Sequence, residues 1–96
     1  MKQLKILVVF YLKVKELNMK ASPNPSASWF TLKIESDGTL QPMTLKVTDM
    51  SGKVLGVWKN LVGGQTIQLG TNYKSGMYIA ELWQGTQRKT IKLIKL

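Results

Sequence analysis

The sequence contains no cysteine and no histidine, and these two absences exclude most of the chemistry that a small domain uses. Without cysteine the chain has no disulfide framework, no thiolate nucleophile and no thiolate metal ligand. Without histidine it lacks the commonest general base and the commonest metal ligand. Since no glycine-rich phosphate loop or nucleophile elbow is present either, we expect a protein that is not an enzyme and that needs no metal or cofactor. Only five acidic residues remain, namely Glu16, Glu35, Asp37, Asp49 and Glu81.

Acidic residues are scarce relative to basic ones, with five against fourteen, a net charge of +9 and an isoelectric point near 10.0. This excess predicts attraction to polyanions such as nucleic acid, lipopolysaccharide or an acidic partner surface. The basic residues are not interleaved with aromatics as on a nucleic-acid-binding sheet, so no nucleic acid partner is expected. We expect most of them on the solvated faces of strands. They concentrate in two groups, which are Lys2, Lys5, Lys13, Lys15 and Lys20, and then Arg88, Lys89, Lys92 and Lys95.

Long hydrophobic runs are also missing, so we expect no transmembrane segment, which would need about 20 apolar residues. Residues 1–20 open with a basic residue and an apolar run, as a secretory signal does. The run over residues 6–12 is short, however, and Lys13, Lys15 and Glu16 follow it where a signal would be small and neutral. Apolar residues recur at every second position, so this stretch predicts a strand over residues 4–14.

The rest of the chain alternates apolar and polar residues in short segments, and none of them has helical periodicity with caps. Turn residues stand at 37–38, 50–53 and 62–64. Alternation breaks at Leu93 and Ile94, which predicts a bulge or burial on both faces of the last strand. The expected strands are 29–36, 43–49, 54–61, 65–69, 76–85 and 88–96. Their expected inward-facing residues include Phe30, Leu32, Ile34, Met43, Leu45, Val47, Ile67 and Leu69.

Six or seven short strands at roughly ten-residue spacing predict an all-β fold, an immunoglobulin-like antiparallel β-sandwich of about seven strands. Tyr78 follows Gly76 as in a tyrosine corner, so we expect its hydroxyl to bond to the backbone. Asp49 is expected to close an Asx turn over residues 50–52 rather than to bind a metal. Pro23 and Pro25 predict a stiff, extended stop between two structural elements.

Four motifs follow one another in the sequence: PNP at 23–25, D-x-x-G-K at 49–53, G-x-Y at 76–78 and a basic closing segment at 88–96. In this order and spacing, the chain from about residue 22 to residue 96 closely resembles the type A C-terminal sorting domains of substrates of the type IX (Por) secretion system. The resemblance implies a seven-stranded immunoglobulin-like sandwich that directs the protein carrying it across the outer membrane of a Gram-negative bacterium. The matching positions are Pro23, Asn24, Pro25, Asp49, Gly52, Lys53, Gly76, Tyr78, Lys89, Lys92 and Lys95.

The resemblance also implies partners for the domain. The type IX translocon would bind it after passage through the periplasm, a surface sortase would remove it, and the cargo would be released or attached to lipopolysaccharide. Residues 21–96 would form the sorting domain and residues 1–20 a strand or junction with a preceding cargo, so we expect a fragment of a longer protein. Lys92 and Lys95 are the best candidates for partner contact, and an exposed first or last strand predicts an edge-to-edge dimer as one mode of assembly.

The residues alone leave a second interpretation open. A carbohydrate-binding β-sandwich module of a secreted enzyme would use Trp29, Trp58 and Trp83 as a stacking platform for sugar rings. Exposed rings on one shared face would favour this function. Burial of one or two of them would instead indicate core or strand-edge packing.

Overall fold

The computed structural model describes residues 17–36 and 41–96, and in these ranges the chain forms seven strands. The strand predicted at residues 4–14 and the turn at 37–38 lie outside the described residues. The sequence does not indicate β1, because this short strand holds only two apolar side chains. The strands are β1 (Asn18–Ser22), β2 (Phe30–Glu35), β3 (Met43–Asp49), β4 (Val54–Leu61), β5 (Thr66–Leu69), β6 (Gly76–Gln84) and β7 (Gln87–Lys95).

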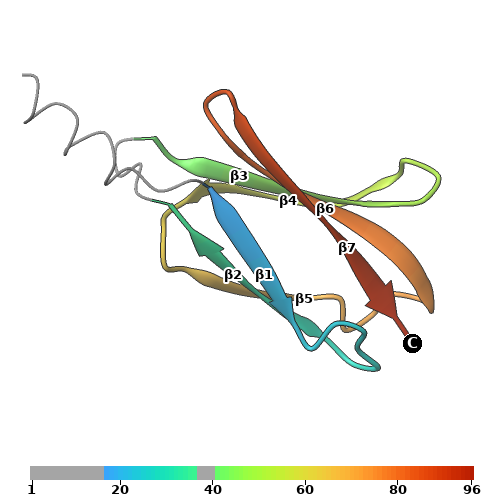
Figure 1. The fold of residues 1–96 in the computed structure, drawn as a ribbon. Coiled ribbons are helices and arrows are strands. Elements are labelled where there is room, and N and C mark those ends of the chain that lie inside the picture. Colours follow the sequence, from blue (N-terminus) through green and yellow to red (C-terminus); the bar gives the residue numbers. More distant parts are fainter. Residues whose placement is uncertain (1–16, 37–40) are drawn as a thin grey trace, which may run out of the picture.

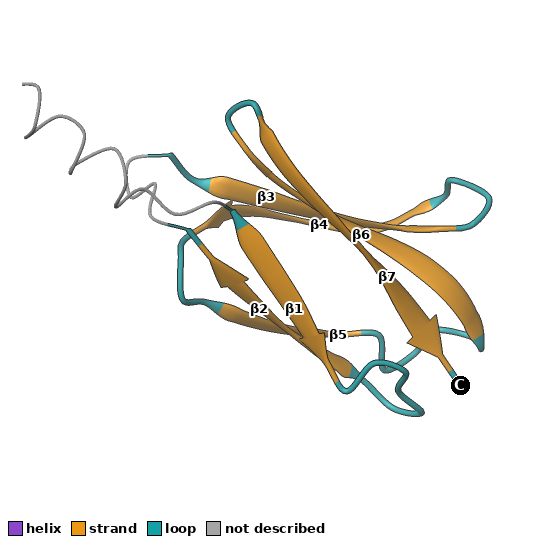
Figure 2. Cartoon of the chain, viewed as in Figure 1, coloured by secondary structure: helices purple, strands orange, loops and turns teal. Residues whose placement is uncertain are grey.

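The strands form two antiparallel sheets that face each other (Figures 1 and 2). The small sheet has the order β1-β2-β5, and the large sheet has the order β4-β3-β6-β7. The chain passes from one sheet to the other after β2, after β4 and after β5. This arrangement confirms the predicted immunoglobulin-like antiparallel sandwich of seven strands.

The core lies between the two sheets and consists of the inward side chains of every strand except the first half of β7. In β2 and β3 every second side chain points toward the opposite sheet, as the sequence predicts. Burying these side chains is the main favourable contribution to folding. The buried apolar residues are Leu17, Met19, Phe30, Leu32, Ile34, Met43, Leu45, Val47, Leu61, Ile67, Leu69, Tyr78, Ala80, Leu82 and Leu93.

The last strand keeps a regular register, which excludes a bulge as one of the two expected reasons for its broken alternation. β7 pairs with β6 without a shift from Gly76 opposite Lys95 to Gln84 opposite Gln87. Leu93 is buried on the inner face while Ile94 is half-buried on the outer face, so burial on both faces explains the break in the pattern. The next inward position after Leu93 belongs to Lys95, which the apolar pattern does not reveal.

Gly56 in β4 has a packing role that yields a testable prediction. A Cβ atom at Gly56 would lie 2.6 Å from Cη2 of the Trp58 ring, which packs partly buried against the core. We expect Gly56→Ala to lower the free energy of unfolding by about 1–2 kcal/mol, because the ring must leave its place. Urea unfolding would measure the loss, and the Trp58 indole N–H resonance would report the displaced ring. Val57→Ala on the exposed outer side is the control, and an unmoved Trp58 resonance in Gly56→Ala would contradict the prediction.

Candidate functional site

Three of the four sequence motifs and the last residues of the fourth, the closing segment, lie at the same end of the sandwich, which we call the motif end. It consists of the PNPS segment (residues 23–26), the β3–β4 turn (residues 49–53), the start of β6 and the last residues of β7. Asp49 pairs with Tyr78, Gly76 pairs with Lys95, and Ser26 forms a parallel bridge with Lys95. In Figure 1 this is the end at which the C-terminus lies. Segments up to 70 residues apart in the sequence therefore form one surface region.

The PNPS segment covers part of the free edge of β7. The Asn24 side chain donates from Nδ2 to the Lys92 carbonyl at 2.8 Å and accepts from the Ile94 N–H through Oδ1 at 2.9 Å. Ser26 continues the pairing, with its N–H 3.0 Å from the Ile94 carbonyl and its own carbonyl 2.9 Å from the Leu96 N–H. Both prolines follow cis peptide bonds. Residues 23–25 end β1 as predicted, but they form bends rather than the extended stretch expected. The segment is also a short cap on the last strand.

The D-x-x-G-K motif forms the predicted Asx turn. Oδ1 of Asp49 accepts hydrogen bonds from the Ser51 N–H at 2.9 Å, the Ser51 hydroxyl at 2.6 Å and the Lys53 N–H at 2.9 Å. Gly52 has a φ of 90°, a conformation that glycine adopts at little cost. Lys53 takes part through its backbone, while its side chain is exposed. The motif therefore fixes the shape of the turn and leaves an ammonium group on the surface.

The three donors lower the pKa of Asp49, the Ser51 hydroxyl most, followed by the Lys53 N–H. The unfolded chain, with an Asp pKa of about 3.9, takes up the proton first as the pH falls. The carboxylate therefore stabilises the fold fully above that value, and this contribution is lost as the pH falls through the lower, folded-state pKa. We expect the stability difference between the wild type and Asp49→Asn to be largest near neutral pH and to shrink below about pH 4 in urea unfolding. A difference that stays constant down to about pH 2 would contradict this role of the charge.

Tyr78 forms the predicted tyrosine corner. Its hydroxyl donates to the Lys74 carbonyl at 2.5 Å, and its buried ring stacks on Tyr73 with the centroids 4.6 Å apart. Burial raises the pKa of the Tyr73 phenol, and the neighbouring Tyr78 adds to this effect. Gly76, at the start of β6, has a φ of 150°. The G-x-Y motif thus anchors the β5–β6 loop to the motif end.

Lys95 does not occupy the exposed position that we expect for a contact residue. Its side chain is buried, with 6% of the residue exposed. The ammonium donates to the carbonyl groups of Ser28, of Gly70 at 2.5 Å and of Thr71 at 3.2 Å. Lys95 therefore joins the end of β7 to the loop before β2 and to the loop after β5. The expectation that its ammonium contacts a partner is corrected by this burial.

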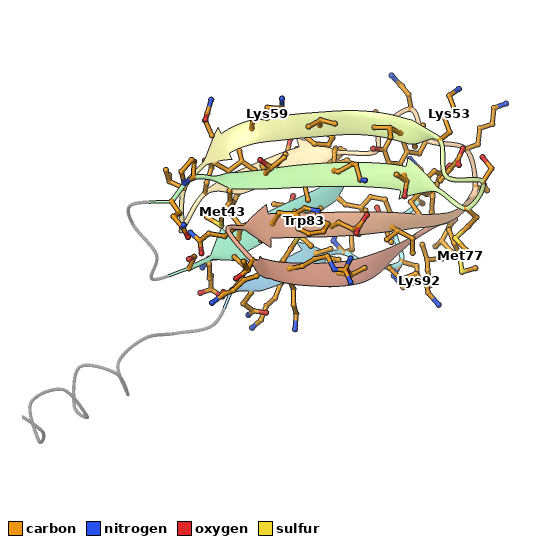
Figure 3. All side chains as sticks on the ribbon, turned by 90° about the horizontal axis from the view of Figure 1, so that it is seen from above. Met43, Lys53, Lys59, Met77, Trp83 and Lys92 are labelled. Atoms are coloured by element: carbon orange, nitrogen blue, oxygen red, sulfur yellow. The ribbon has the colours of Figure 1, made fainter. Side chains whose placement is uncertain are left out.

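Lys89 and Lys92 are both exposed, but they point to opposite sides of β7. Lys92 lies on the outer face of the large sheet at the motif end (Figure 3), opposite Ile79 of β6. Lys89 pairs with Leu82, which is an inward position, and lies nearer the start of β7, farther from the motif end. Of the three lysines in the closing segment that match the family motif, only Lys92 therefore presents its ammonium at the motif end.

Sequence reasoning missed the contributions of Ser26 and Tyr73. Ser26 is buried, and its hydroxyl donates to the Trp29 carbonyl at 2.6 Å. Tyr73 lines an open hollow beside the β3–β4 turn, and only its position next to turn residues in the sequence could have indicated it. The hollow has a volume of about 280 Å³ and is lined by Asp49, Lys53, Leu55, Asn72, Tyr73, Lys74 and Tyr78.

The three tryptophans do not form a shared platform. Trp29 lies in the loop before β2 and is exposed, whereas Trp58 packs against the core. Trp83 lies on the outer face of the large sheet, away from the motif end, under the guanidinium of Arg88, which is 5.1 Å from the ring centroid (Figure 3). The stacking surface that a carbohydrate-binding module would form from these three tryptophans is therefore absent.

The described residues contain no group of three acidic, histidine or cysteine side chains that is placed to hold a metal ion. No helix in residues 17–36 and 41–96 has the length and apolar character needed to span a membrane. The polar side chains of Asn24, Asp49 and Lys95 bond mainly to backbone groups of the fold. These bonds fix the shape of a basic surface that another molecule could recognise.

Comparison with protein families shows what this surface belongs to. Residues 20–96 match the family described as the secretion system C-terminal sorting domain. Comparison with curated proteins gives no match. The matched range contains the PNPS segment, the β3–β4 turn, the tyrosine corner and β7, so it covers the whole motif end. The chain therefore belongs to the family of C-terminal sorting domains of the type IX secretion system, which mark a protein for export to the cell surface or the medium.

Proposed function

We propose that this domain carries an attached cargo protein from the periplasm across the outer membrane, and that the type IX translocon recognises the motif end. The cargo precedes the domain, and it is secreted or held on the cell surface after export. The observation that supports this proposal most is the convergence at the motif end of the PNP, D-x-x-G-K and G-x-Y motifs with the last residues of the closing segment. A sequence signal that is scattered over 70 residues becomes a single surface only in the folded state.

The motif end suits recognition because its backbone is held in place by side chains. Asp49 fixes the β3–β4 turn, Tyr78 fixes the β5–β6 loop, and Asn24 and Lys95 hold the end of β7. A surface whose shape is set before binding loses less conformational entropy when it binds. Lys53, Lys74 and Lys92 leave their ammonium groups exposed there, which favours an acidic partner. We infer that the domain has no enzymatic activity of its own and acts by binding.

A surface sortase would then remove the domain. We propose that it cuts on the N-terminal side of residue 17, because Leu17 is buried and β1 pairs with β2 along its whole length. A boundary between residues 20 and 21 would divide β1. N-terminal sequencing of the domain released by cells would identify the bond, and a released fragment that begins after Leu17 would contradict this placement.

A secretion assay tests the proposed function. Residues 1–96 would be fused behind a Sec signal and a fluorescent reporter in a bacterium with an active type IX system. We expect the reporter on the surface or in the medium, and in the periplasm when residues 88–96 are deleted. Deletion also removes β7 from the fold, so a matched pair of exposed lysines separates recognition from folding. Lys53→Ala at the motif end should reduce export, whereas Lys33→Ala on the outer face of β2 should not. A folded wild-type domain that stays in the periplasm would overturn the proposal.

A further inference from the structure

The outer faces of the two sheets differ in character. The outward residues of the small sheet are polar throughout, as in the cross-strand pairs Lys20 with Lys33 and Thr31 with Gln68. An antiparallel sheet with one solvated face is expected to look like this. The large sheet departs from that pattern at its motif end. There five apolar side chains point outward, and together they form what we call the outer patch: Val54, Val57, Met77, Ile79 and Ile94.

Strand pairing places the members of the outer patch on β4, β6 and β7, with the outward Thr48 of β3 between Ile79 and Val54. Met77 of β6 lies opposite Ile94 of β7, and Ile79 lies opposite Thr48 of β3, which in turn lies opposite Val54 of β4. Val54 is 49% exposed and Met77 is 41% exposed. An apolar cluster that remains this open on a solvated sheet face commonly marks an interaction surface.

The charges around the outer patch indicate the chemistry of its partner. Lys53 lies at the β4 edge of the sheet and Lys92 lies on β7 at the other edge, near Met77 (Figure 3), and neither forms an ion pair with any of the described residues. Among the described residues Glu81 is the acidic side chain that points outward from the strands of this sheet, and its oxygens lie 3.7 Å from the Lys46 ammonium and 3.8 Å from Arg88. The rim that remains is therefore basic. Apolar contact at the centre with carboxylates at the rim is the complementary arrangement.

We propose that the outer patch docks against an apolar protein surface rimmed by carboxylates, on a component of the type IX machinery. This inference rests on the proposed function for the identity of the machinery, while the chemistry of the partner surface follows from the residues of the patch. The small sheet stays outside the contact, because its outer face has no comparable apolar cluster among the described residues.

A photocrosslinking experiment in the secreting bacterium tests the docking surface. The full chain, attached to the reporter, would carry p-benzoylphenylalanine in place of Ile79 or, as a matched control, in place of Thr31. Both positions are half-buried and point outward, one from each sheet. We expect a protein adduct from position 79 and none from position 31. Mass spectrometry should place the crosslink in an apolar segment flanked by Asp or Glu.

Charge reversal tests the rim with two lysines of the same strand. Lys92→Glu should lower the yield of the adduct from position 79 about tenfold, because an attraction at the rim becomes a repulsion. Lys89→Glu, which points to the other side of β7, should leave the yield unchanged. Circular dichroism and thermal unfolding would show that both variants fold.

The outcomes separate this inference from the proposed function. An exported reporter without a protein adduct from position 79, or with an adduct from position 31 alone, overturns the docking surface and leaves the sorting function intact. An adduct to lipid instead of protein also overturns it. A reporter that is not exported contradicts the sorting function, and the absence of an adduct in those cells overturns the docking surface as well.

Discussion

Replacing Lys95 by methionine is expected to lower the free energy of unfolding by about 3 kcal/mol, although the change is one residue from the end of the chain. Methionine retains much of the length of the lysine stem and fills the same path into the interior. It cannot donate to the carbonyl groups of Ser28, Gly70 and Thr71, which face the ammonium. Hydrogen bonds to a charged group contribute more than neutral ones, and a buried carbonyl left without a donor costs about 1–3 kcal/mol.

The expected loss corresponds to a fall in melting temperature of about 15 °C for a domain of this size. Urea unfolding and thermal unfolding of the purified chain would measure it. Lys92→Met is the matched control, since Lys92 lies on the same strand with its side chain exposed, and its replacement should change stability by less than about 0.5 kcal/mol. Equal stability of the two variants would show that the ammonium of Lys95 contributes nothing beyond its methylene groups.

The Lys95 variant also distinguishes two roles for the basic closing segment in export. If Lys95→Met lowers export more than it lowers the fraction of folded domain, Lys95 is needed for the shape of the motif end as well as for stability. The exposed Lys92, by contrast, should affect export through its charge and not through stability. Comparing export with the fraction of folded domain for each variant separates the two effects.

The sandwich itself could be predicted because alternation is a local property of the sequence. In β2 and β3 apolar residues recur at every second position, and this period alone predicts a strand. The residues are Phe30, Leu32 and Ile34 in β2, and Met43, Leu45 and Val47 in β3. The Asx turn and the tyrosine corner are also local, because Asp49 and Tyr78 bond within four residues of themselves. Such features can be predicted from the local sequence without knowing which segments pack against them.

The parts that could not be predicted depend on segments that are far apart in the sequence. Asn24 bonds to backbone groups about 70 residues away, and the partners of Lys95 are 24 to 67 residues away. Composition favours the surface for any lysine, and the break in alternation at Leu93 and Ile94 hid the inward position of Lys95. The outer patch was hidden for the same reason, because its apolar residues become neighbours only when β4, β3, β6 and β7 are placed in order.

Replacing Asn24 by alanine is expected to open the edge of β7. The amide of Asn24 bonds to the Lys92 carbonyl and the Ile94 N–H in place of a neighbouring strand, and alanine provides neither bond. We expect a loss of about 1.5 kcal/mol in the free energy of unfolding, since two partly exposed hydrogen bonds are removed. Hydrogen exchange of the Ile94 amide should become at least about tenfold faster, because each 1.4 kcal/mol changes an opening equilibrium tenfold.

The same variant tests whether the PNPS segment prevents pairing between copies of the chain. In an antiparallel ladder the backbone groups of alternate residues point outward, so Arg88 and Thr90 already present theirs on the side of β7 away from β6. Opening Ile94 and Lys92 extends this free edge toward the C-terminus, and an edge of that length is a template for another strand. Sedimentation velocity should therefore show concentration-dependent dimers for Asn24→Ala, and not for Ser28→Ala, whose hydroxyl lies in the same loop and makes no bond to β7. Monomeric Asn24→Ala with fast Ile94 exchange would mean that the side chain stabilises the edge without protecting it from self-association.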